Sequence, residues 1–449
     1  MDLDKSSLLV DSSPSKKFFV SMITKDVSIE SCIGDLLDNS IDSAKKKSIN
    51  KARIDINFNI DKNYIEINDN CGGMTKDIAL NNAFKFGNFE LRNSGSLGMY
   101  GIGMKRSLFK LGKDFIVESK CGEDSFIVSM NLDEWLDLKD ENNNELWKFH
   151  YIDKKLNFSD GLHIKISNLH SDISNFLGRF SNIENIKSSI KGKYKNFINN
   201  GIDIFINNVQ ITFNDEILFD SSILTTYKKT YISEKVEYKI IIGLGAPTPK
   251  EAGWNIICNG RYIILNDKSS LTGWENAYNL NDDEELDVIL QNKKVPAYHN
   301  DFARFRGYII FDAENPNELP LNTTKDGIDE SHPLYVKAKT EMMYIMGEVL
   351  SKLRLLQKVN RQYKSENRTT PDNDFKQNYL ASVIQKPDSN FRLNLDDFKA
   401  QDNKKIVSIQ MTVFELNKYK VYFGVDTNRE LGEEIFKFLK DRVIIDEQL

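Results

Sequence analysis

The chain has 449 residues, enough for two or three domains, and carries a formal net charge of −6 with 40% hydrophobic and 28% charged residues. This composition is typical of a globular protein and excludes a collagenous or wholly disordered chain. No stretch reaches the roughly 18 unbroken apolar residues of a membrane helix, and the first residues do not resemble a signal peptide. The four cysteines are widely spaced. This spacing argues against a disulfide scaffold or a zinc ribbon and is typical of a protein in the reducing cytoplasm.

An acidic helix is the first chemical signal along the chain, expected over residues 28–44 with Ser28 as its N-cap. Its apolar residues fall on one side at about 100° per residue. The opposite side could hold a phosphate-bound Mg²⁺ or orient a water molecule. A solvated acidic face is the alternative interpretation. The residues on this side are Asp35, Asp38, Asn39 and Asp42.

Two extended segments follow at residues 53–60 and 64–68, and the second runs into the turn Asp69-Asn-Cys-Gly-Gly73. A buried aspartate at such a strand end can accept a hydrogen bond from an exocyclic amine. The glycines would allow a flat ring to lie against the backbone. The turn therefore predicts one end of a binding site.

Glycine is concentrated further on, because seven of the 24 glycines lie within residues 72–103. The last three, Gly98, Gly101 and Gly103, come directly before a helix expected to extend to residue 112. Backbone amides at a glycine-rich helix N-terminus form an anion site, to which Lys105 adds positive charge. A mobile surface loop is the weaker alternative, because apolar and aromatic residues alternate with these glycines.

In order and spacing, these three segments resemble the nucleotide-binding motifs of the GHKL superfamily, which includes gyrase, heat-shock chaperones, histidine kinases and MutL. Residues 35–42 resemble the family's "ELIDNSIDA" helix, and residues 97–105 resemble its "IGQYGNGLK" segment. Residues 84–87 are similar to the beginning of its nucleotide lid, expected here over about residues 86–100. The resemblance is greatest to the MORC-type branch and its bacterial relatives, is specific over residues 28–112 and ends near residue 330.

The resemblance implies ATP and Mg²⁺ as ligands. Asp35 would be the general base, Asn39 would bind Mg²⁺, and Asp69 would accept a hydrogen bond from the adenine amino group. Lys325 has the place of a transducer lysine that reaches the γ-phosphate in the relatives, although an ordinary surface lysine is the alternative. The remaining expected contacts to the nucleotide are Asp42, Gly73, Met74, Gly98, Tyr100, Gly101, Ile102, Gly103 and Lys105.

Three departures from the family pattern bear on these expectations. The usual glutamate base is replaced by the shorter Asp35, which predicts weaker hydrolysis. Cys71 replaces the first glycine of the family's D-x-G-x-G motif, so we expect Cys71 beside the nucleotide and Gly72 in the special backbone conformation. Leu162 stands where the family has a threonine, and no role is assigned to it.

The expected fold class is α+β, and the resemblance implies a Bergerat-type α/β sandwich that binds ATP, followed by a mixed α/β transducer-like domain. A long basic helix follows, whose charged face is expected to be solvated, with a nucleic-acid or partner surface as the alternative. A polar linker then leads to a small C-terminal βα module with strand-like runs at Ile406–Phe414 and Tyr419–Val425. The five segments are expected at residues 1–172, 173–332, 333–366, 367–402 and 403–449.

Together these features predict a slowly ATP-hydrolysing conformational switch that closes its lid and homodimerises on Mg-ATP. It would act in the cytoplasm on DNA or a protein partner, without a membrane, and the resemblance suggests bacterial DNA transactions or phage defence. The alternative is a non-hydrolysing ATP sensor that recruits a partner protein, which the replacement of glutamate by Asp35 keeps open.

Overall fold

The computed structural model describes residues 12–87, 96–98, 101–278, 293–322, 324–398 and 410–446. The chain divides into two compact units, Met1–Asp397 and Phe398–Leu449. Tyr100, one of the expected nucleotide contacts, and most of the expected lid lie outside the described residues.

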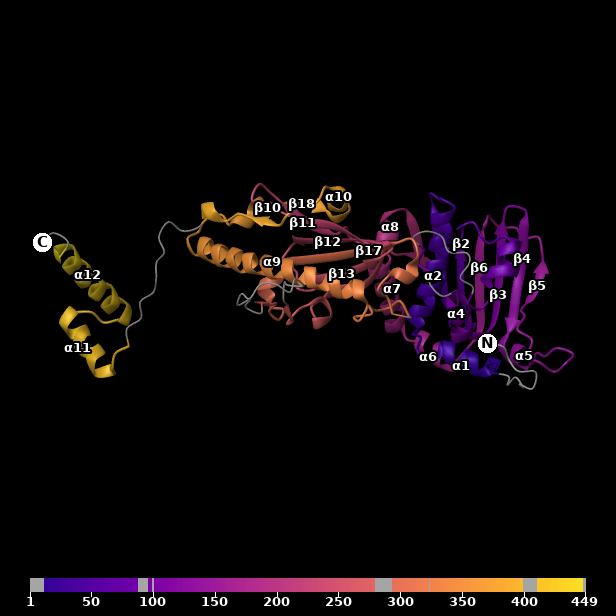
Figure 1. The fold of residues 1–449 in the computed structure, drawn as a ribbon. Coiled ribbons are helices and arrows are strands. Elements are labelled where there is room, and N and C mark those ends of the chain that lie inside the picture. Colours follow the sequence, from indigo (N-terminus) through magenta and orange to yellow (C-terminus); the bar gives the residue numbers. More distant parts are fainter. Residues whose placement is uncertain are drawn as a thin grey trace, which may run out of the picture. The chain divides into compact units, whose positions relative to one another are not determined.

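The first unit begins with an eight-stranded mixed sheet in the order β5-β4-β3-β6-β2-β1-β7-β8. Helices lie along one side of this sheet (Figure 1). Its strands are β1 (Ala52–Asn59), β2 (Tyr64–Asp69), β3 (Gly112–Cys121), β4 (Asp124–Asn131), β5 (His150–Asp153), β6 (Gly161–Leu169), β7 (Ile202–Ile206) and β8 (Val209–Gln210). Its helices are α1 (Lys16–Thr24), α2 (Ile29–Lys46), α3 (Lys76–Ile78), a π-helical turn (Ala79–Ala83), α4 (Gly103–Leu111), α5 (Leu132–Asp137), α6 (Ser171–Leu177), α7 (Phe180–Lys193) and α8 (Lys195–Asn199).

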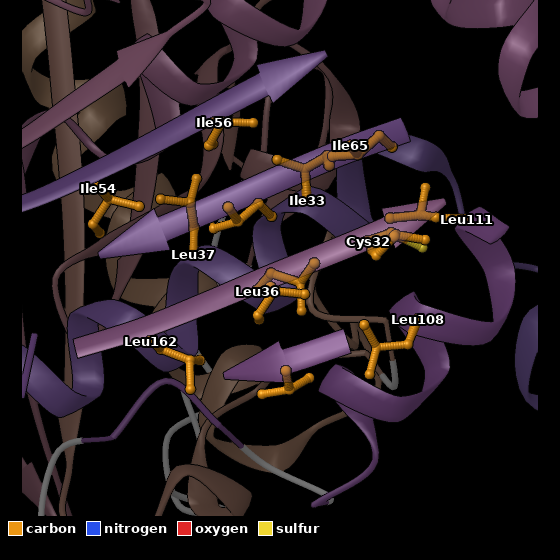
Figure 2. Close-up of a cluster of buried hydrophobic side chains, with 14 of the residues drawn as sticks. Cys32, Ile33, Leu36, Leu37, Ile54, Ile56, Ile65, Leu108, Leu111 and Leu162 are labelled. Atoms are coloured by element: carbon orange, nitrogen blue, oxygen red, sulfur yellow. The ribbon is translucent and has the colours of Figure 1, made fainter. Parts of the chain in front are cut away.

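The core of this part forms between the sheet and helices α2 and α4. Alternate residues of β1 and β2 are buried, as expected for strands with one covered face. Cys32, Ile33 and Leu37 of α2 are fully buried and belong to one cluster with Ile65 of β2 and Leu108 of α4 (Figure 2). The apolar side of α2 therefore belongs to the core, and Asp35, Asn39 and Asp42 on its other side border a cavity.

The expected boundary at residues 172/173 is wrong, because the chain returns to the first sheet after three helices. β7 pairs in parallel with β1, with Ile204 beside Ile54, and a parallel pairing of this kind requires a crossover connection. Helices α6 to α8 belong to that crossover. The hairpin turn between β7 and β8 lies at Asn207 and Asn208, both with positive φ.

A second sheet of five strands has the order β11-β12-β17-β13-β14, and the long helix α9 runs along it (Figure 1). Trp254 and Met346 join this helix to the sheet, with the indole Nε1 3.1 Å from the sulfur. The elements of the sheet are β11 (Tyr227–Ser233), β12 (Val236–Leu244), β13 (Gly253–Cys258), β14 (Arg261–Asp267), β17 (Phe305–Ala313) and α9 (Pro333–Ser365). Smaller strands are β9 (Ile217–Asp220), β10 (Leu224–Thr225), β15 (Ala277–Tyr278), β16 (Lys293–Lys294), β18 (Lys376–Tyr379) and β19 (Arg392–Leu393).

The linker expected over residues 367–402 is largely wrong. Strand β18 pairs antiparallel with β9, and β19 pairs with β10. Between them, helix α10 (Leu380–Gln385) buries Leu380 and Val383 in a cluster with strands of the second sheet. The few apolar residues of this polar segment are therefore enough to fix it to the second sheet.

The second unit contains helices rather than the expected βα arrangement in its described part. Helix α11 (Val413–Phe423) includes most of the run expected as a strand at Tyr419–Val425. A capping box between Thr412 and Glu415 begins it, and Gly424 ends it in a left-handed conformation. Helix α12 (Asn428–Asp446) follows, and residues 406–409 of the first strand-like run lie outside the described part.

No helix within the described residues has both the length and the apolar character that crossing a lipid bilayer requires.

Candidate functional site

A cavity of about 310 Å³ lies over the acidic side of α2. It is bordered by the turn after β2, the residues before α4, and one side chain from the loop that leads towards α9. Twelve of the sequence-predicted site residues within the described part of the chain contribute to its lining, whereas Asp38 and Cys71 do not. The twelve are Asp35, Asn39, Asp42, Asp69, Gly73, Met74, Gly98, Gly101, Ile102, Gly103, Lys105 and Lys325.

Asp35 lies at the inner end of this cavity and is 3% exposed. Arg106 of α4 approaches one carboxylate oxygen, Oδ2, with Nη2 at 2.5 Å and Nε at 3.2 Å. The other oxygen, Oδ1, lies 3.7 Å from Nζ of Lys325. The close approach of α4 to Asp35 depends on Gly103, because a Cβ at position 103 would lie only 3.1 Å from Cγ of Asp35. The expected base is therefore held between two cations.

Asp69 ends β2 and is also buried. Its Oδ1 accepts hydrogen bonds from the backbone N–H groups of Cys71, at 2.9 Å, and Leu162, at 3.1 Å. Its Oδ2 accepts a hydrogen bond from the Ser40 hydroxyl at 2.6 Å. Since a carboxylate offers about four acceptor positions, one position on Oδ2 remains for a ligand. Burial raises the pKa of Asp69 above its usual range, and the three hydrogen bonds oppose this effect.

The turn after Asp69 explains how the chain accommodates a cysteine in the glycine motif. Gly72 and Gly73 have φ values of +89° and +61°, so Gly72 has the left-handed conformation that the sequence predicts. The expectation for Cys71 is wrong. It is fully buried in the core, and burial raises the pKa of its thiol. Cys71 does not line the cavity, because its side chain belongs to the hydrophobic core.

Asp42 holds the residues that follow the expected lid. Its carboxylate accepts backbone hydrogen bonds from Leu97 at 2.9 Å and Gly98 at 3.0 Å. Burial raises the pKa of Asp42 to about 6, although these hydrogen bonds favour the charged form. From the second sheet, Nδ2 of Asn259 donates a hydrogen bond to the carbonyl of Ser96 at 3.0 Å. The first unit thus has two halves, one built on the first sheet and one on the second sheet. Residues 96–98 are attached to both of them.

The ammonium group of Lys105 is occupied by backbone in this structure. It donates hydrogen bonds to the carbonyls of Ala83 at 2.9 Å, Lys85 at 2.7 Å and Gly101. This side chain therefore joins the beginning of the expected lid to the glycine-rich segment. Because it is buried, the pKa of Lys105 falls to about 8.

Lys105 predicts a pH-dependent contribution to stability. Between pH 8 and its ordinary pKa of 10.5, the folded protein has released this proton while the unfolded chain still binds it. The free energy of unfolding should therefore rise with pH in this window. The measurement is chemical denaturation of the native protein and of Lys105→Met at several pH values. As the pH rises through this window, the free energy of unfolding of the native protein should increase relative to that of Lys105→Met. A constant difference would contradict this assignment.

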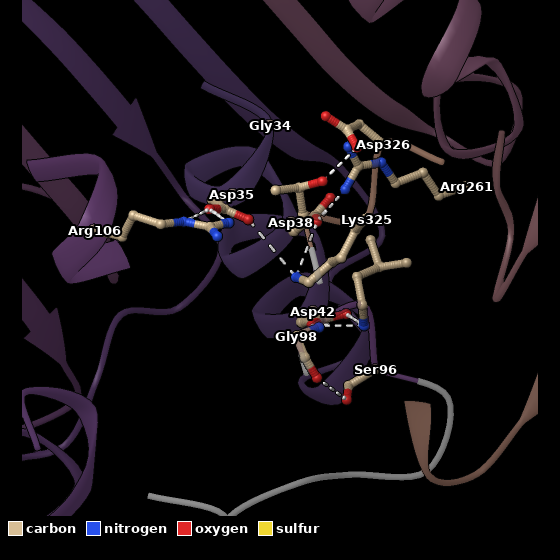
Figure 3. Close-up of polar contacts among 12 residues, drawn as sticks. Gly34, Asp35, Asp38, Asp42, Ser96, Gly98, Arg106, Arg261, Lys325 and Asp326 are labelled. Carbon is tan, nitrogen blue, oxygen red and sulfur yellow. Dashed lines mark hydrogen bonds and ion pairs between the residues drawn. The ribbon is translucent and has the colours of Figure 1, made fainter. Parts of the chain in front are cut away.

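A second buried ion pair lies next to Asp35 on the same helix. Asp38 is 1% exposed, and its Oδ2 accepts a hydrogen bond from Nη1 of Arg261 at 2.6 Å. Its Oδ1 accepts one from the hydroxyl of Tyr194 at 2.8 Å. Lys325 lies 3.7 Å from both Asp35 and Asp38, as Figure 3 shows. Two cations from the second half of the unit thus meet the acidic side of α2.

Asn39 differs from its neighbours because it is the exposed residue on this part of α2. It borders the cavity, which leaves its side-chain oxygen accessible as a metal ligand. Among the described residues, no group of three or more His, Cys, Asp or Glu side chains could hold a metal ion. A cation here would therefore depend on Asn39 together with oxygen atoms of the ligand and water, a mode of binding that suits Mg²⁺.

The comparisons with known proteins agree with this geometry. Residues 27–161 match the family model described as histidine kinase-, DNA gyrase B-, and HSP90-like ATPase. This range contains α2, the turn at Asp69 and α4, and so includes most of the cavity lining. No curated protein matches the chain significantly. The match supports a GHKL-type ATPase domain in this part of the chain, and domains of this type generally bind ATP with Mg²⁺.

Sequence reasoning missed four residues that the structure brings to the site. Arg106 follows Lys105 directly, and its position one turn after Gly103 was the available signal, because residues three apart share a helix face. Ser40 directly follows Asn39 in α2, and this position among the acidic residues was a comparable signal. Arg261 and Tyr194 are more than 150 residues from Asp38, and no local pattern indicates their contact.

The contact that we expect between Asp69 and adenine is open to a direct test. Losing a buried hydrogen-bond acceptor typically costs about 1–3 kcal/mol, so Asp69→Asn should weaken ATP binding by that amount. Titration calorimetry on the native protein and the variant measures the change, and an unchanged unfolding midpoint would show that the variant is folded. Equal affinity of the native protein for ATP and GTP would contradict the assignment.

Proposed function

We propose that this protein is an Mg-ATP-dependent conformational switch that hydrolyses ATP slowly. The observation that carries this proposal is the convergence of three segments on one cavity, with Lys325 completing it from the second half of the unit. The family match over residues 27–161 supports ATP as the ligand. Lys325 lies outside the matched range, and its 3.7 Å approach to Asp35 supports a functional connection between the two halves.

The residues of the cavity fit a purine nucleotide with a phosphate chain. Asp69 retains one acceptor position for an exocyclic amine. The first turn of α4, beginning at Gly103, has backbone N–H groups without partners inside the helix, which favour phosphate oxygens. Asn39 would contribute its side-chain oxygen to Mg²⁺, and the metal would neutralise part of the phosphate charge.

Asp35 is the residue that we propose as general base. In hydrolysis, the oxygen of a water molecule would form a bond to the γ-phosphorus while the bond from this phosphorus to the bridging oxygen breaks. Asp35 would accept the proton of the water, and ADP would leave with the bridging oxygen. Lys325 lies where it could stabilise negative charge next to this carboxylate.

The switching part of the proposal rests on contacts between the two halves of the unit. Arg261, Lys325 and Asn259 come from the second half and contact Asp38, Asp35 and the backbone at Ser96. Movement at the nucleotide would therefore be transmitted to the second sheet. Following the resemblance, we propose that Mg-ATP closes the lid and promotes homodimerisation, and that DNA or a protein partner receives the signal, for example in DNA transactions or phage defence.

The binding proposal is tested with Asn39→Ala. This variant should lose most Mg-dependent ATP affinity while it retains the native unfolding midpoint, because the side chain is exposed and borders the cavity. Titration calorimetry with and without Mg²⁺ measures the difference. Unchanged affinity in the presence of Mg²⁺ would remove Asn39 from the site.

Homodimerisation is tested separately by light scattering with ATP, ADP or a non-hydrolysable ATP analogue, each with and without DNA. We expect dimers with ATP and the analogue and monomers with ADP. A monomer under all conditions would contradict the dimer while leaving ATP binding intact. The non-hydrolysing sensor remains the second candidate, because both oxygens of Asp35 already face cations in this structure.

A further inference from the structure

We propose that Arg106 is a positioning residue that fixes the carboxylate of Asp35 for hydrolysis. This inference rests on the proposed ATPase function and adds a residue to it. Arg106 is 6% exposed, lines the cavity, and directs two of its N–H groups to the same oxygen of Asp35, at 2.5 and 3.2 Å. Two hydrogen bonds to one oxygen restrict rotation of the carboxylate and leave Oδ1 free of Arg106.

The geometry of α4 explains why arginine occupies this position. Gly103 brings the helix against Asp35, and Arg106 lies one turn later on the same face. The neighbouring Lys105 points elsewhere, to the carbonyls of residues 83, 85 and 101. Consecutive residues of α4 therefore have different tasks: Lys105 joins backbone segments, and Arg106 holds the side chain that we propose as base.

Arginine is suited to this task because its planar guanidinium keeps two donors at a fixed relative angle. Aspartate is one methylene shorter than glutamate, so its carboxylate reaches less far into the cavity. Because Arg106 holds Oδ2 of Asp35, Oδ1 is directed towards the cavity and Lys325. Correct orientation matters in catalysis, because a displacement of about 1 Å can reduce a rate by about 10²-fold.

The test compares Arg106→Gln and Arg106→Lys with a matched variant at an exposed ion pair. Arg53→Gln is suitable as the control because Arg53 pairs with Asp55 on the surface of β1. We expect kcat to fall by about 10–10²-fold in Arg106→Gln, while the Kd for ATP, measured by calorimetry, changes less than about threefold. Arg106→Lys should recover part of kcat, and Arg53→Gln should match the native protein.

A double-mutant cycle separates positioning from other roles. If Arg106 acts through Asp35, adding Arg106→Gln to Asp35→Asn should produce little further loss of kcat. In the nucleotide-free protein, Arg106→Gln should lower the melting temperature, and the double variant should recover part of it, because no unpaired carboxylate remains.

Three outcomes would overturn the proposal. A large increase in the Kd for ATP with unchanged kcat would make Arg106 a phosphate ligand. Additive losses in the double variant would mean that Arg106 acts independently of Asp35. Native kcat in a folded Arg106→Gln protein would exclude any role in hydrolysis. If the native protein instead binds no ATP at all, the proposed function fails, and the melting temperatures still show whether the two side chains are coupled.

Discussion

Replacing Asp35 by Asn is expected to reduce ATP hydrolysis by about 10²–10⁴-fold, the usual contribution of a general base. The change retains the size of the side chain and one oxygen that can accept hydrogen bonds from Arg106. It removes the group that we propose as acceptor of the proton of water. ATP affinity should remain close to the native value, so the variant should accumulate in the nucleotide-bound state.

Phosphate release and calorimetric titration distinguish loss of the chemical step from loss of binding. Asp35→Glu is the informative companion variant, because the resemblance places glutamate here. The longer glutamate side chain would lie close to Gly103, since a Cβ built at position 103 would already be 3.1 Å from Cγ of Asp35. If Asp35→Asn hydrolyses ATP at the native rate, another residue is the base. If the native protein has no activity above background, the sensor interpretation is favoured.

The local parts of the site could be predicted because their signals lie within short segments. The N-cap at Ser28, the apolar face of α2 and the position of the acidic face all follow from helical periodicity, and the structure has them. The glycines before α4 also lie where the backbone comes close to other groups, since a Cβ at Gly103 would be 3.1 Å from Cγ of Asp35; their approach to a ligand stays a prediction. These features depend on residues three or four apart, which is the range over which sequence patterns are informative.

Contacts between distant segments could not be predicted in the same way. Segment 371–398 is polar, and its attachment depends on the pairing of β18 with β9, about 160 residues earlier. Tyr419–Val425 is rich in aromatic and β-branched residues, which favour strands, yet the capping box at Thr412 and Glu415 begins a helix. Cys71 was misplaced because its side chain is buried in the hydrophobic core, and its position within the glycine motif gives no local signal of that burial.

The second large effect is expected at the ion pair between Asp38 and Arg261. Both side chains are almost fully buried, and the pair joins α2 to β14. Arg261→Met should lower the free energy of unfolding by about 3–5 kcal/mol, because it leaves a buried carboxylate without its main partner. The Tyr194 hydroxyl and Lys325, at 3.7 Å, would compensate only in part.

Urea denaturation of the native protein, Arg261→Met and the double variant Asp38→Leu/Arg261→Met measures this effect. The double variant should regain much of the lost stability, because replacing both members of a buried pair by apolar residues is often close to neutral. Lys113→Met, at an exposed pair with Asp133, should change stability little and serves as the control. If Arg261→Met were as stable as this control, water or Lys325 would satisfy Asp38, and the pair would not hold α2 to the second sheet.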